Sequence, residues 1–181
     1  MIPFAETVMP RLVSLGVLLA LAIGCAKLSP PPAASGPVDL TEVRADGLAS
    51  ALDERKGKVV LVDFWATWCA PCVKKFPHFV STHNKYADKG LVCISVSMDK
   101  LWSRGDYSKG DVLAFLREKG AAFPNFVATD DEKKISQRFG LGDSIPFMAL
   151  FNRAGEKVWD REEKELSDRE LDKLIESELA K

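Results

Sequence analysis

Cysteine and histidine are scarce in this chain, whose 181 residues include four cysteines and two histidines. Four cysteines are too few to hold together a small disulfide-rich domain, and their uneven spacing excludes a zinc module, which needs a second matching pair. The histidines, His78 and His83, are five positions apart rather than four, which argues against a metal site on one helix face. The sequence therefore predicts neither a metal nor a cofactor.

An excess of either charge is also missing, because 25 basic residues face 26 acidic ones and the formal net charge is -1. The basic residues are interspersed with acidic ones, and no cationic stripe is present that could neutralise a run of phosphates. This pattern excludes nucleic acid as a partner. No internal repeat is visible, and the chain without its N-terminal segment has the length of one compact domain.

The apolar run near the N-terminus is too short to cross a bilayer comfortably. It covers residues 12–24, thirteen uncharged residues preceded by Arg11, whereas a transmembrane helix needs about 20. A run of this length is typical of a secretory signal peptide, which we place at residues 1–24. The sequence therefore predicts export.

Cys25 follows this run directly, and the segment Leu21–Cys25 resembles the lipobox of bacterial lipoproteins. The resemblance implies cleavage before Cys25 and lipidation of its thiol, which would anchor the protein in the cell envelope. The alternative is an ordinary signal peptide with Cys25 unmodified, and both interpretations export the protein. Residues 25–37 contain three consecutive prolines and predict an extended tether. We expect the folded domain at residues 38–181.

Apolar periodicity within residues 38–181 predicts an α/β domain. Strands are expected at residues 38–43, 59–65, 91–96, 123–128, 146–151 and 157–159, and helices at residues 48–57, 70–87, 111–119, 132–139 and 168–179. Residues 99–108 are expected to form a surface loop, and residues 160–165 a solvated surface of mixed charge. Gly155 is placed to take a positive φ in the hairpin turn between the last two strands. This order predicts a central mixed sheet with helices on both faces.

A Cys-x-x-Cys pair, Cys69 and Cys72, lies where the apolar strand at residues 59–65 gives way to a helix. Unpaired backbone N–H groups at a helix N-terminus stabilise a thiolate, so Cys69 is the candidate nucleophile. Cys72, one turn further along, is placed to resolve a mixed disulfide by attacking Cys69. Pro71 lacks an N–H where the helix start needs none, and the Ala70–Pro71 dipeptide is expected to tune the redox potential. A purely structural disulfide is the alternative.

The segment Val62–Cys72, VDFWATWCAPC, resembles the active-site stretch of the thioredoxin superfamily almost residue for residue. Ala70 stands where thioredoxin itself has glycine, and Pro77 matches the family's helix-kinking proline. The additional segment around residues 111–119 resembles the central insertion of the exported TlpA and ResA-like branch. The resemblance covers residues 38–181 and implies a thioredoxin-like fold with that insertion.

Further site residues follow from this resemblance. Asp63 lies in an apolar strand, where burial should raise the pKa of its carboxyl and let it accept or relay the Cys72 proton. The resemblance also implies a cis bond between Ile145 and Pro146, beside which the family binds extended substrate peptide, and Trp68 should border the reactive sulfur. The alternative is that Asp63 is a buried polar group with its hydrogen bonds satisfied and with no role in proton transfer. Cys93 is expected to be a small buried hydrophobe.

The resemblance implies an exported protein-disulfide reductase that takes electrons from a membrane donor and passes them to cysteines of substrate proteins. Apocytochrome c is one candidate substrate. A disulfide oxidase or isomerase is the alternative within the same chemistry, and equilibrium against glutathione separates the two. A metallochaperone would need a histidine ligand downstream of the cysteines, and no histidine follows His83. A peroxidase would need one peroxidatic cysteine framed by threonine and arginine, which the Trp-Cys-Ala-Pro-Cys context does not resemble.

Overall fold

A computed structural model of the chain describes Met1, residues 36–103 and residues 105–181. The predicted signal peptide, Cys25 and most of the tether lie outside these residues. The strands are β1 Thr41–Val43, β2 Val59–Trp65, β3 Leu91–Ser97, β4 Asn125–Ala128, β5 Phe147–Phe151 and β6 Lys157–Asp160. The helices are α1 Ala45–Asp53, α2 Ala70–Tyr86, the 3-10 turn η1 Ala87–Lys89, α3 Asp99–Trp102, α4 Lys109–Lys119, α5 Glu132–Phe139 and α6 Asp168–Leu179.

The six strands form one mixed sheet in the order β1-β4-β3-β2-β5-β6. Four adjacent strands run parallel to one another, namely β1, β4, β3 and β2. The fifth strand in the order, β5, pairs antiparallel with β2 and with β6. All seven residues of β2 are buried, as expected for a central strand that is covered on both faces. The predicted central mixed sheet is confirmed.

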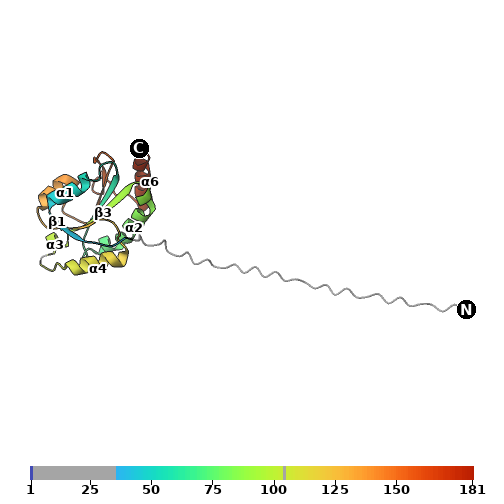
Figure 1. Cartoon of the computed structure of the whole chain (residues 1–181), viewed down its shortest axis with the longest axis horizontal. Coiled ribbons are helices and arrows are strands. Elements are labelled where there is room, and N and C mark those ends of the chain that lie inside the picture. The colour runs from blue at the N-terminus through green and yellow to red at the C-terminus, as the bar shows by residue number, and fades with distance from the viewer. Residues whose placement is uncertain (2–35, 104) are drawn as a thin grey trace. The chain divides into compact units, whose positions relative to one another are not determined.

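Two apolar layers sandwich the sheet. Buried side chains of α2, α4 and α6 pack with Leu61 and Trp65 on one face, while those of α1 and α5 pack with Val62 and Phe64 on the other. Figure 1 shows α1 and α2 on opposite sides of β3. Alternate residues of β2 therefore enter different layers, and Asp63 shares the face of Leu61 and Trp65, which is the face that α2 covers.

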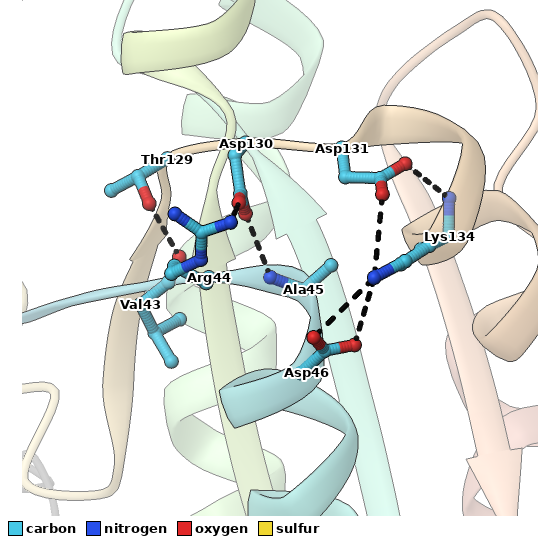
Figure 2. A network of polar contacts seen from close by, with 8 residues as sticks. All are labelled: Val43, Arg44, Ala45, Asp46, Thr129, Asp130, Asp131 and Lys134. Carbon is cyan, nitrogen blue, oxygen red and sulfur yellow. Dashed lines mark hydrogen bonds and ion pairs between the residues drawn. The ribbon is translucent and has the colours of Figure 1, made fainter.

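Helix α1 begins without a capping side chain of its own, because Arg44 occupies the N-cap position. Asp130, which follows β4, replaces the missing cap: its Oδ1 accepts a hydrogen bond from Ala45 N at 2.9 Å, and its other oxygen pairs with Arg44 at 2.8 Å. Thr129 donates from both its backbone N and its hydroxyl to Val43 O. Figure 2 shows these contacts tying the start of α1 to the end of β4. They fix the short edge strand β1 in place.

Two expectations from the sequence are wrong in part. Within residues 99–108, Asp99–Trp102 forms the short helix α3 rather than a loop, and Asp99 is buried. Asp160, expected on a solvated surface, is also buried, because its carboxylate pairs with Lys157 and accepts a hydrogen bond from Glu163 N. Asp99 is satisfied by donors from Ser97 and from Thr67, which is 32 positions earlier, whereas Asp160 is satisfied by Lys157 and Glu163, three positions away on either side.

Candidate active site

The cysteine pair lies at the junction between β2 and α2. Cys69 is the N-cap residue of α2, and its Sγ is joined to Cys72 Sγ in a disulfide, so the structure represents the oxidised form. Cys72 N donates to Cys69 Sγ at 3.3 Å. In the reduced protein the same N–H, at the positive end of the helix, favours a thiolate at Cys69. Ala70 and Pro71 are both exposed in the first turn between the two sulfurs.

The Ile145–Pro146 peptide bond is cis, in agreement with the family resemblance. Ile145 O lies 3.8 Å from Cys69 Sγ, although residue 145 follows residue 69 by 76 positions. This is a van der Waals contact in the oxidised form, because a disulfide sulfur carries no proton to donate. The contact nevertheless brings an X-Pro segment and the candidate nucleophile to one place on the molecule.

The two tryptophans near the cysteines have different environments. Trp65 is fully buried, with its ring centroid 4.8 Å from that of Phe76 and 4.8 Å from that of Phe115. Trp68 is 51% exposed. It lines an open cavity of about 360 Å³ together with residues that include Trp102. Trp65 therefore stabilises the core beneath the site, whereas Trp68 presents half of its surface to solvent.

Asp99 supports the loop that leads into the cysteines, and the sequence analysis missed it. Its carboxylate accepts hydrogen bonds from Thr67 N at 3.1 Å, from the Thr67 hydroxyl and from Ser97 Oγ at 2.7 Å. Thr67 precedes the Trp68-Cys69 segment directly, so Asp99 fixes the backbone there. No local sequence signal identifies this role, because Thr67 and Asp99 are 32 positions apart.

Asp63 is buried in β2, with 3% of its surface exposed, on the sheet face covered by α2. Among the described residues, no hydrogen-bond donor reaches its Oδ1. Burial raises the pKa of Asp63 to about 7, opposed by the positive charges of Arg161 and Lys75. The carboxyl thus changes protonation state near neutral pH, which a proton acceptor for a thiol requires.

Cys93 is the third cysteine of the described residues, and it is fully buried and unpaired in β3. Burial, together with the nearby charge of Asp63, raises the pKa of the Cys93 thiol well above its usual value. The thiol stays neutral and packs with apolar side chains of the core that includes Leu61 and Leu91. Its environment is that of a small buried hydrophobe, as predicted.

Within the part of the chain that the structure describes, no group of three or more His, Cys, Asp or Glu side chains is placed to hold a metal ion. None of the helices in residues 36–103 and 105–181 is both long and apolar enough to cross a membrane.

The fold and the cysteine pair define a thioredoxin-like protein with a dithiol–disulfide site. The Redoxin family matches residues 28–175, and the chain belongs to this family. It is 34% identical over 113 residues to the thiol-disulfide oxidoreductase ResA of Bacillus thuringiensis, a match that covers 62% of this chain and only 60% of that relative. It is 30% identical over 132 residues to ResA of Bacillus cereus, covering 71% of this chain and 70% of that protein.

Solved structures agree with this assignment. The thioredoxin domain of a thiol-disulfide oxidoreductase from Bacteroides vulgatus superposes with a TM-score of 0.56 and 28% identity, covering 70% of this chain and 82% of that one. The resemblance to the thioredoxin superfamily and its ResA-like branch is confirmed.

Proposed function

We propose that the protein is a thiol–disulfide oxidoreductase that acts outside the cytoplasm and reduces disulfides of other proteins. The observation that carries this proposal is the Cys69–Cys72 disulfide at the N-terminus of α2, with Ile145 O in contact with Cys69 Sγ. The named activity of the ResA relatives supports it. Cysteine pairs of exported proteins are the proposed substrates, with apocytochrome c as one candidate.

The reaction begins from the reduced protein. The Cys69 thiolate attacks one sulfur of a substrate disulfide, a mixed disulfide forms, and the other substrate sulfur leaves as a thiolate. Cys72 then attacks Cys69 Sγ, the mixed disulfide breaks, and the second substrate sulfur leaves. Two electrons have passed to the substrate, and the Cys69–Cys72 disulfide seen in the structure is the oxidised product. A thiol donor at the membrane is proposed to restore the dithiol.

Asp63 supplies the proton acceptor for the second step. Cys72 must lose its proton before it attacks, and buried Cys72 has little access to solvent, with 2% of its surface exposed. Asp63 lies on the sheet face beneath α2, and its pKa of about 7 leaves a large fraction ionised at neutral pH. The carboxylate is therefore proposed to take the Cys72 proton as the new S–S bond forms.

The direction of exchange is tested by titrating the full chain against mixtures of reduced and oxidised glutathione. We expect a reduction potential near that of thioredoxin, about −270 mV, because an exported reductase must give electrons to its substrates. The fractions of dithiol and disulfide are measured by thiol alkylation and mass spectrometry. A potential near about −120 mV, as in strong disulfide oxidases, would contradict the reductase and favour the oxidase alternative.

Membrane anchoring is proposed to depend on Cys25, which follows the predicted signal peptide. Cys25→Ser is expected to move the protein from the membrane fraction to the soluble fraction of the envelope, because the proposed lipid chains are attached to this thiol. Fractionation followed by immunoblotting measures the change, and Cys93→Ser is the matched control that should stay with the membrane. Unchanged membrane association of Cys25→Ser would refute lipidation at this residue.

A further inference from the structure

Asp63, Met148 and Arg161 form a row across the sheet beside the active site. Asp63 in β2 is paired with Met148 in β5. Arg161, which follows β6 directly, donates its backbone N–H to Met148 O at 3.0 Å, so it is the next residue in the same row. Residues opposite one another in antiparallel strands place their side chains on the same face of the sheet. Asp63 and Arg161 therefore lie on the same face, separated by one strand.

That face is the one covered by α2. Trp159, two positions before Arg161, belongs to the same apolar layer as Leu61 and Trp65, which flank Asp63 in β2. Met148 lies between Arg161 and Asp63 in this row. An arginine side chain is long enough to extend over a methionine toward a carboxyl on the far side of it. The sheet register therefore places a positively charged side chain on the same face as the buried Asp63 carboxyl, with one strand between them.

One buried polar atom of each charged group has no hydrogen-bond partner among the described residues. Arg161 is half-buried, and within residues 36–103 and 105–181 no acceptor is within hydrogen-bond distance of its buried Nε. The buried Oδ1 of Asp63 is in the same condition. A buried charge without hydrogen bonds is costly unless an opposite charge lies near it, and the charge of Arg161 favours the ionised form of Asp63 in this way.

The other groups that face Asp63 contribute less. Cys93 from β3 is a neutral thiol, and Ser95, which is paired with Asp63, donates its hydroxyl to Asn125 Oδ1 instead. Lys75 from α2 is a second cation, but its side chain is 41% exposed and lies 3.5 Å from Glu165. Among the charged side chains that lower the pKa of Asp63, Arg161 has the largest effect and Lys75 the second largest.

We propose that Arg161 is a positioning residue for the proton transfer at Asp63: its guanidinium favours the ionised carboxylate and so keeps Asp63 ready to accept the Cys72 proton. This inference rests on the proposed function. In the step concerned, the proton passes from Cys72 Sγ to the Asp63 carboxylate, and the bond between Cys72 Sγ and Cys69 Sγ forms. The bond between Cys69 Sγ and the substrate sulfur breaks, and that sulfur leaves with the electron pair and takes a proton from solvent.

The direct test is the titration of the Asp63 carboxyl carbon by NMR in the oxidised full chain, where neither Cys69 nor Cys72 titrates. The resonance of Asp63 is assigned as the carboxyl signal that is missing from the spectrum of Asp63→Asn. Arg161→Met keeps the apolar stem and removes the charge, so it is expected to raise the pKa of Asp63 and reduce its acid dissociation constant by about tenfold. Arg161→Lys keeps the charge and is expected to titrate close to the parent.

Two controls make the result specific. Lys75→Met should give a smaller upward shift, and Arg117→Met, at an exposed position of α4, should give none. If Arg161→Met does not fold, as judged by near-UV circular dichroism, Arg161→Gln takes its place. The proposal would be overturned if a folded variant without the charge at residue 161 had the same Asp63 pKa as the parent. It would also be overturned if Arg161→Lys raised the pKa of Asp63 as far as Arg161→Met.

A kinetic measurement separates this inference from the proposed function. The pH at which resolution of a mixed disulfide reaches half its maximal rate should rise in Arg161→Met by as many pH units as the pKa of Asp63 rises in the NMR titration, with the rate at pH 9 unchanged. If the parent protein exchanges no disulfides at any pH, the proposed function fails. If the parent exchanges normally and the pH midpoint of Arg161→Met equals that of the parent, only the role of Arg161 fails.

Discussion

Cys72→Ser is expected to abolish multiple turnover and to accumulate mixed disulfides between Cys69 and substrate proteins. The reason is that the variant keeps the nucleophile at the N-terminus of α2 but loses the sulfur that releases the substrate, which in the parent lies within bonding distance of Cys69. Serine cannot form the S–S bond that completes the exchange. Non-reducing electrophoresis of envelope proteins after acid quenching, followed by mass spectrometry, measures the trapped complexes.

Matched variants make this result interpretable. Cys69→Ser removes the nucleophile, so it should trap nothing and show no turnover. Cys93→Ala should trap nothing and keep the parent's turnover, because the Cys93 thiol is buried in the core away from solvent. If Cys69→Ser trapped the same proteins as Cys72→Ser, the assignment of nucleophile and resolving cysteine would be wrong.

Elements with strong local signals are predicted well by the sequence. Helix α5 has the predicted bounds, Glu132–Phe139, and so does α6, Asp168–Leu179, which begins with a capping box of Ser167 and Glu170. Gly155 has φ 82° in the hairpin turn, as its position between two strands predicts. In these segments the periodicity and the end signals lie within a few residues of one another, so no distant contact is needed to place them.

The unpredicted features depend on contacts between distant segments. Asp99 is buried because Thr67, 32 positions earlier, supplies donors to it. The position of Arg161 on the same sheet face as Asp63 depends on the register of β2 with β5 and of β5 with the residues after β6. Sequence pattern identifies such strands but does not determine which residues stand opposite one another, because register depends on packing over the whole sheet.

The active site also has features that the sequence predicts and features that only the fold determines. The Cys-x-x-Cys spacing after an apolar strand predicts Cys69 and Cys72 from the sequence, and the family resemblance adds Asp63. What surrounds Asp63 is visible only in three dimensions, since its neighbours come from β3, β5, α2 and the segment after β6. The protonation behaviour of the carboxyl is therefore a property of the fold, and substitution at residue 63 tests it directly.

Asp63→Asn is expected to slow disulfide exchange by roughly 100-fold at pH 7, because an amide cannot accept the Cys72 proton and general-base catalysis contributes about 10²- to 10⁴-fold. The parent's rate should rise with pH through the pKa of Asp63, about 7, as the carboxylate forms. The variant should lack this inflection. Stopped-flow measurement of mixed-disulfide resolution across pH 5–9 records both effects, and an unchanged profile would exclude Asp63 as the proton acceptor.

The same substitution is expected to stabilise the oxidised protein at high pH. Burial raises the pKa of Asp63 in the folded state from 3.8 to about 7, so the unfolded state binds fewer protons than the folded state between these values. The parent therefore loses stability as pH rises from about 4 to about 7, by about 4 kcal/mol in total. Urea unfolding should show Asp63→Asn matching the parent at pH 4 and exceeding it by a few kcal/mol at pH 8. If Asp63→Asn and the parent had equal free energies of unfolding at both pH values, the Asp63 carboxyl would not be held at a raised pKa. If Asp63→Asn exchanged disulfides more slowly without being more stable at pH 8, the catalytic role of Asp63 would be separate from the effect of its burial.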